Sequence, residues 1–111
     1  MPLFLDGVKK IGNSAFYCCS SLESIAIPNS VEEVGDHSFA FCTSLESVKL
    51  SDSMSAIESG VFYGCGSLKN VVIPNGVTSI GISAFYKCTS LKSVTIPNSV
   101  TSIGNNAFSN C

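Results

Sequence analysis

Residues 77–99, VTSIGISAFYKCTSLKSVTIPNS, decide the fold of this chain, because their pattern returns every 23 residues. We number the full copies at 8–30, 31–53, 54–76 and 77–99 as repeats 1 to 4, and a partial repeat 5 covers 100–111. Tandem copies at a fixed short period are typical of solenoids, in which each unit buries its apolar face against the next. The recurring positions are Phe16, Phe39, Phe62, Phe85 and Phe108; Cys19, Cys42, Cys65, Cys88 and Cys111; and Leu22, Leu45, Leu68 and Leu91.

Within one repeat, the residue types predict three short elements. Residues 90–96 alternate apolar and polar side chains and predict a strand, which the turn residues at 97–99 end. Residues 100–103 predict a second extended stretch, and residues 104–108 predict a capped single helical turn. Copies stacked about 4.8 Å apart would pair their strands into a parallel sheet. We therefore predict an α/β repeat solenoid that forms one domain, with the sheet on one face and helical turns on the other sides.

The composition limits the classes of function. The chain has 111 residues, of which 45% are hydrophobic and 13% charged, so it is too apolar for intrinsic disorder. No apolar run reaches the length of about 18 residues that a membrane-spanning helix requires. The first residues lack the basic and apolar segments of a signal peptide. All six basic residues are Lys and the net charge is −2, which argues against a nucleic-acid partner.

The repeat LxSVxIPxSVTSIGxxAFxxC resembles the BspA-like class of leucine-rich repeats, which occurs in cell-surface proteins of bacteria and protozoa. The resemblance covers the chain from about residue 8 onwards, and residues 4–7 look like the end of an earlier copy. It implies a curved solenoid, a role in adhesion or protein recognition, and no catalytic residues. We expect the departures from the pattern to disturb the side turn of repeat 3 rather than the fold. They are Ser38 and Val61 for Ala, Ser51 for Pro, and Glu58 for Gly.

The six cysteines do not predict a disulfide framework. Five of them occupy one repeat position, so their Cβ atoms would stack about 4.8 Å apart. A disulfide requires roughly 3.8 Å between these atoms. The sequence has no CxxC pair and no Cys–His cluster, which leaves a zinc site without support. We predict a column of small buried thiols, with Cys18 and Cys111 exposed.

No arrangement of residues in the sequence predicts catalysis. His37 is the only imidazole and precedes Cys42 by five residues. A Cys–His pair would require the thiol to leave its buried column and a third group to orient the ring. The chain has no GxSxG motif, no Ser-His-Asp order and no phosphate-binding glycine loop. We predict that the protein is not an enzyme, that it uses no cofactor or metal, and that His37 is a solvated residue of the side turn.

Charge is distributed unevenly along the chain. All eight acidic residues lie between Asp6 and Glu58, so residues 1–58 carry three Lys and a net charge of −5, whereas residues 59–111 carry +3. Because sequence order is axial order in a solenoid, we predict an acidic N-terminal half and a mildly basic C-terminal end. This asymmetry either orients a charged partner or a second copy, or it reflects drift at solvated positions. The 23-residue register predicts ion pairs between neighbouring repeats at Lys9–Glu32, Lys10–Glu33 and Glu46–Lys69.

Two sets of positions are candidates for binding a protein partner. The sheet side carries a charged column in which like charges lie on adjacent strands, an unfavourable arrangement that hints at a partner. The side turn carries large aromatic residues, which either anchor an interface or merely cover the turn. The sheet face alone would fall short of the roughly 800 Å² that each partner contributes to a specific interface, so other faces must take part. The candidates are Glu23, Glu46, Lys49, Lys69, Val72 and Lys92 on the sheet side, and Tyr17, Phe41, Tyr63 and Tyr86 on the side turn.

Neither end of the repeat array shows a polar capping unit. We therefore expect that the chain is part of a longer array, or that an open end is covered by a partner or by self-association. We favour a protein-recognition module from a cell-surface or secreted array, as the resemblance implies. The alternative is a small stand-alone binder or inhibitor of one protein in the cytoplasm. The initiating Met and the missing signal segment favour this alternative.

Overall fold

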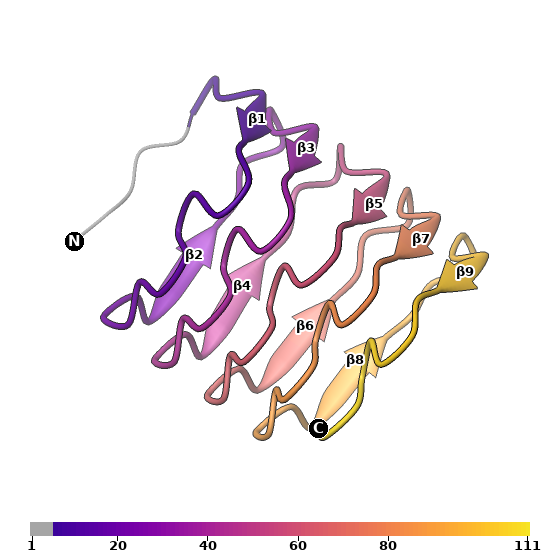
Figure 1. Ribbon diagram of the computed structural model, residues 1–111. Helices are drawn as coiled ribbons and strands as arrows, with labels where there is room; N and C mark the ends of the chain where they lie inside the picture. The colour runs from indigo at the N-terminus through magenta and orange to yellow at the C-terminus, as the bar shows by residue number, and fades with distance from the viewer. Residues whose placement is uncertain (1–5) are drawn as a thin grey trace.

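The computed structural model describes residues 6–111 as a coil of short strands and turns (Figure 1). Each turn of the coil contributes a three-residue strand to one side and a two-residue strand to another. The longer strands form a four-stranded sheet in the order β2 (Ser24–Ala26), β4 (Ser47–Lys49), β6 (Asn70–Val72) and β8 (Ser93–Thr95). The shorter strands are β1 (Lys10–Ile11), β3 (Glu33–Val34), β5 (Ala56–Ile57), β7 (Ser79–Ile80) and β9 (Ser102–Ile103).

Paired residues in neighbouring turns lie one repeat apart. Ser24 pairs with Ser47, and Ile57 pairs with Ile80, in each case between parallel strands. In Figure 1 the successive strands accordingly lie side by side from the indigo to the yellow end of the chain. The prediction of a parallel-sheet solenoid is confirmed. The expected remnant of an earlier copy at residues 4–7 falls largely outside the described residues.

The predicted helical turns are wrong, and with them the α/β class, because residues 6–111 contain no helix. Two positions of every side turn are left-handed, a conformation that cannot continue a right-handed helix. The backbone N–H groups of the turn therefore do not follow the hydrogen-bond pattern of an α-helix. The Tyr17 N–H donates to Ser14 O within the turn at 3.1 Å, whereas the Phe16 N–H donates to Ser38 O of the next repeat at 2.7 Å. The left-handed residues are Ser14, His37, Gly60, Ser83 and Asn106, and Cys18, Phe41, Gly64, Lys87 and Asn110, with φ between 57° and 73°.

A stack of phenylalanine rings runs through the core. Its neighbouring centroids lie 5.1 to 5.7 Å apart, and the ring planes are within 17° of parallel. Phe39, Phe62 and Phe85 are completely buried, and the rings at the two ends of the stack, Phe16 and Phe108, are half-buried. Every repeat therefore completes the core of the next, as expected for a solenoid.

The stacking is interrupted between repeats 2 and 3. Within the described chain, β1 and β3 form one small sheet and β5, β7 and β9 form another, so β3 and β5 are not paired. At the same boundary β4 and β6 are in register only at Ser47 and Asn70, whereas β2–β4 and β6–β8 pair along all three residues. The side turns stay joined, since the Phe41 N–H donates to Tyr63 O at 2.7 Å. The strands separate while the side turns hold the repeats together.

Glu58 explains why β3 and β5 separate. A Cβ atom at Gly81 would lie 2.6 Å from Ser59 N, and one at Gly35 would lie 2.7 Å from Asn13 N, so these glycines permit a close approach to the preceding repeat. Glu58 occupies the same repeat position but carries a Cβ, which forces its backbone away from repeat 2. The disturbance expected from this departure falls on the strands rather than on the side turn.

Candidate interaction surfaces

The side turns carry a continuous row of aromatic rings, which we call the aromatic ladder: Tyr17, Phe41, Tyr63 and Tyr86. Neighbouring centroids lie 5.8, 5.3 and 5.0 Å apart, with interplanar angles of 83°, 62° and 32°. The sequence places Phe41 one position out of line with the three tyrosines. Its ring nevertheless fills the gap, because it lies over Gly64, where a Cβ atom would come within 2.7 Å of the ring. The structure thus brings all four predicted side-turn residues together.

Much of the aromatic ladder faces solvent. Tyr17 is 48% exposed and Phe41 is 38% exposed. At the repeat 4 end, Lys87 Nζ lies 5.6 Å from the centroid of the Tyr86 ring, a geometry typical of a cation–π contact. His37 is exposed, and its ring centroid lies 6.4 Å from that of Tyr63. Because each ring packs on its neighbours, few rotamers remain to be ordered when a partner binds.

The ion pairs of residues 6–111 are all exposed. The predicted pairs are present, with N–O distances of 3.8 Å for Lys9–Glu32, 3.4 Å for Lys10–Glu33 and 3.1 Å for Lys69–Glu46. Exposed pairs of this kind contribute about 0–1 kcal/mol each to stability. Within residues 6–111, the lysines without an ion pair are Lys49, Lys87 and Lys92. The fold does not depend on these three charges, which leaves them available to a ligand.

A cleft of about 380 Å³, which we call the seam cleft, opens where β4 and β6 separate. Two of the predicted partner-binding residues, Lys49 and Val72, lie in it. Glu23, Glu46, Lys69 and Lys92 do not line it. Sequence reasoning missed the cleft itself, although Ser51 and Glu58 mark the same repeat boundary as departures from the pattern. The lining residues are Val48, Lys49, Leu50 and Asp52 from repeat 2, and Asn70, Val72 and Pro74 from repeat 3.

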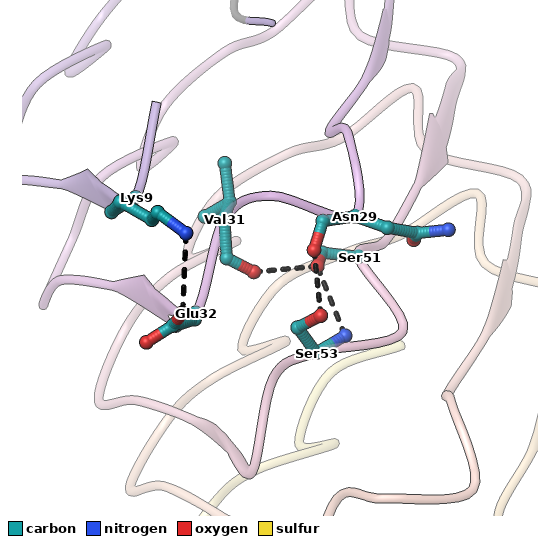
Figure 2. A network of polar contacts seen from close by, with 6 residues as sticks. All are labelled: Lys9, Asn29, Val31, Glu32, Ser51 and Ser53. Atoms are coloured by element: carbon teal, nitrogen blue, oxygen red, sulfur yellow. Dashed lines mark hydrogen bonds and ion pairs between the residues drawn. The ribbon is translucent and has the colours of Figure 1, made fainter. Parts of the chain in front are cut away.

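Figure 2 shows polar contacts made by Ser51 and Ser53 in the turn of repeat 2. Asn29 Oδ1 accepts the Asp52 N–H at 2.8 Å, and Ser53 Oγ donates to Asn29 O at 2.6 Å. Within repeat 2 itself, the buried Ser51 hydroxyl donates to Val31 O, a bond that the usual Pro could not make. Among the described residues, no side-chain hydrogen bond joins this turn to repeat 3. The turn is therefore held toward repeat 1, and the seam cleft lies on its other side.

The cysteine column is built from neutral thiols. The thiols of Cys42, Cys65 and Cys88 each donate to the carbonyl of a phenylalanine in the preceding repeat, with S–O distances of 3.1 to 3.2 Å. Burial raises the pKa of Cys42 to about 11 and that of Cys88 to about 12, and it also raises the pKa of Cys65. All six cysteines are free, and Cys18 and Cys111 are exposed as predicted. The described residues contain no group of three or more His, Cys, Asp or Glu that could hold a metal ion.

We expect iodoacetamide at pH 8 to alkylate Cys18 rapidly, and Cys42, Cys65 and Cys88 only after unfolding, because the thiolate is the reactive form. Raising the pH to 9.5 should still leave Cys42 and Cys88 protonated, since pH 9.5 is below their raised pKa values. Peptide mapping by mass spectrometry with and without guanidinium measures both rates. Alkylation of native Cys65 at the rate of Cys18 would contradict the buried column.

The repeat pattern identifies the family to which this fold belongs. The model of the BspA-type leucine-rich repeat region matches residues 4–111 in six copies. The chain belongs to the BspA-type leucine-rich repeat family. Among curated proteins, none matches this sequence. Proteins of this family are typically non-enzymatic repeat proteins, in agreement with the structural role of the cysteine column.

Solved structures of this repeat class superpose closely on the chain. A leucine-rich repeat protein of T. pallidum is 39% identical with a TM-score of 0.92, and the match covers 100% of this chain and 53% of that one. A leucine-rich cell surface protein of Faecalibacterium prausnitzii is also 39% identical, with a TM-score of 0.95 and coverage of 100% and 29%. The pneumococcal vaccine antigen PcpA is 28% identical over 87% of this chain and 25% of its own, with a TM-score of 0.79. The chain thus spans about half or less of the length of these relatives.

None of the elements in residues 6–111 is a helix with the length and apolar character needed to cross a membrane.

The last turn of the coil exposes Ile96 and Ile103. Self-association through the ends stays a prediction.

Proposed function

We propose that this chain is a protein-recognition module and that the aromatic ladder anchors its partner. The observation that carries the proposal is the unbroken row of four rings along the side turns, two of them more than a third exposed. Tyrosine and other aromatic residues are enriched at protein interfaces and supply many of their hot spots. The family supports this function, since the relative from F. prausnitzii is described as a cell surface protein. A cell-surface or secreted array is the setting that we propose.

The geometry of the rings favours a protein partner over a nucleic acid or a sugar chain. Sequential stacking of bases or sugar rings requires open ring faces. Along the ladder, interplanar angles of 83° and 62° turn the edge of one ring toward the face of the next, which uses part of those faces for contacts within the protein. The exposed edges and the Tyr hydroxyls suit the mixed apolar and polar side chains of a protein surface.

The test compares two variants of the purified protein. Tyr17→Ala/Phe41→Ala removes the two most exposed rings, and Ile82→Ser removes an exposed aliphatic side chain outside the ladder. Biolayer interferometry against a panel of purified extracellular-matrix and cell-surface proteins should find a partner. We expect the double variant to weaken its binding by about a hundredfold or more, the loss of two anchors. Ile82→Ser should bind like the wild type.

Circular dichroism and thermal melting establish that both variants remain folded. Equal binding by the wild type and the double variant would contradict the role of the ladder. A panel without any partner, followed by capture of a partner from the cytosol of the producing cells, would favour the stand-alone binder instead.

A further inference from the structure

We propose that the seam cleft binds an acidic segment of a protein partner by taking up one aliphatic side chain. The inference rests on the proposed function of protein recognition, and it adds a second surface and the chemistry of the segment that fits there. It is carried by the apolar lining of the cleft, by its single position in the repeat array, and by Lys49 and Lys92, which form no ion pair within residues 6–111.

The lining of the cleft is mainly aliphatic. Val48 and Leu50 approach from β4 and the residue after it, and Val72 and Pro74 approach from β6 and the following turn. Val72 is 71% exposed, more than any other large apolar residue of the described chain. A leucine or isoleucine side chain placed here would remove Val72 from water and contact the half-buried Val48, and burial of this apolar area would drive binding.

The cleft occurs at one boundary of an otherwise regular solenoid. The sheet at β2–β4 and at β6–β8 is closed along its length, whereas β4 and β6 part after Ser47 and Asn70. The bond to Asn29 of repeat 1 holds the turn at Asp52 toward repeat 1, and Glu58 keeps β5 from β3. The cleft is therefore a specific site, unlike the columns of side chains that repeat along the sheet.

Two lysines without an ion pair favour carboxylates near the cleft. Lys49 lines the cleft from β4 and forms no ion pair within residues 6–111. Lys92 lies just before β8 and is likewise unpaired there, whereas Lys69 is paired with Glu46. No acidic residue follows Glu58 in the chain. Asp52 also lines the cleft from repeat 2 and would repel an acidic group there. The acidic residues of the segment should accordingly lie toward Lys49 and β8, away from Asp52.

The probe is a fluorescein-labelled pentapeptide of sequence Asp-Glu-Leu-Asp-Glu, and the readout is fluorescence anisotropy with the full chain. Val72→Ser should weaken binding by about tenfold, and Lys49→Gln by about threefold, the scale of one exposed charge pair. Two matched variants should leave binding unchanged: Ile82→Ser for the exposed aliphatic residue and Lys87→Gln for a lysine outside the cleft. Asp52→Asn should strengthen binding. A peptide with Ser in place of Leu should bind far more weakly.

Several outcomes would overturn the inference. They are no binding of the leucine peptide, equal binding of the serine peptide, or equal losses in Lys49→Gln and Lys87→Gln, which would indicate only a general attraction to positive charge. The ladder variant Tyr17→Ala/Phe41→Ala should bind the peptide normally. A partner held through the ladder together with a peptide that does not bind would refute this inference and leave the proposed function intact. A peptide that binds while no partner is found would support the seam cleft as a binding site and count against the proposed function of the aromatic ladder.

Discussion

Phe62→Ala should destabilise the protein by about 3–5 kcal/mol, the usual cost of removing a buried aromatic ring. Phe62 is the central ring of the stack, is completely buried, and lies 5.7 Å from Phe39 and 5.3 Å from Phe85. The surrounding repeats cannot easily collapse into the space, because the Phe62 N–H is held by Ala84 O at 2.8 Å and the Phe39 N–H by Val61 O at 3.0 Å. The cavity would therefore remain and weaken the contacts of repeat 3 with both neighbours.

Urea unfolding followed by circular dichroism measures this loss. Phe108→Ala is the matched control, because Phe108 packs on a single ring of the stack, Phe85, and is only half-buried. We expect it to cost about half as much or less, since the same atoms are already partly exposed to water. Equal losses in the free energy of unfolding for the two variants would contradict the expectation that the buried centre of the stack contributes more to stability than its exposed end.

Gly81→Ala should cost about 1–3 kcal/mol, although it adds a single methyl group to a surface turn. The new Cβ would lie 2.6 Å from Ser59 N and 2.7 Å from Glu58 C, so repeats 3 and 4 would have to move apart. The Gly81 N–H donates to Ile57 O at 2.7 Å and continues the pairing of β5 with β7. The substitution should therefore separate β7 from β5, as Glu58 separates β5 from β3.

Hydrogen exchange of the Gly81 amide, together with urea unfolding, tests this expectation. In the wild type the amide should be protected, and in Gly81→Ala it should exchange much faster. Gly12→Ala is the control, because Gly12 has the same repeat position but no atom within 4 Å of its added Cβ. It should be neutral or stabilising by up to about 1 kcal/mol. A loss of stability in Gly12→Ala as large as in Gly81→Ala would refute the steric explanation.

The repeat alone predicts much of the molecule. A gapless period leaves one register for parallel stacking, so the pairing of the strands, the phenylalanine stack and the ion pair between Glu46 and Lys69 all follow from it. Local propensity was a poor guide to the side turns. Residues 104–108 have the composition of a helical turn, but Asn106 is left-handed, and turn N–H groups such as that of Phe85 donate to the next repeat, here to Ala107 O at 2.8 Å.

The two candidate surfaces could be predicted only in part. The residues that form the aromatic ladder follow from the repeat, but its continuity depends on the Phe41 ring passing over Gly64. The seam cleft could not be foreseen, although Lys49 and Val72 were candidates as separate residues. Its position depends on how closely repeats 2 and 3 approach, which is set by the Cβ of Glu58 and by the bond of Asp52 to Asn29 of repeat 1. The sequence period determines which residues face each other, whereas the distance between repeats results from steric and hydrogen-bond contacts that only the tertiary structure shows.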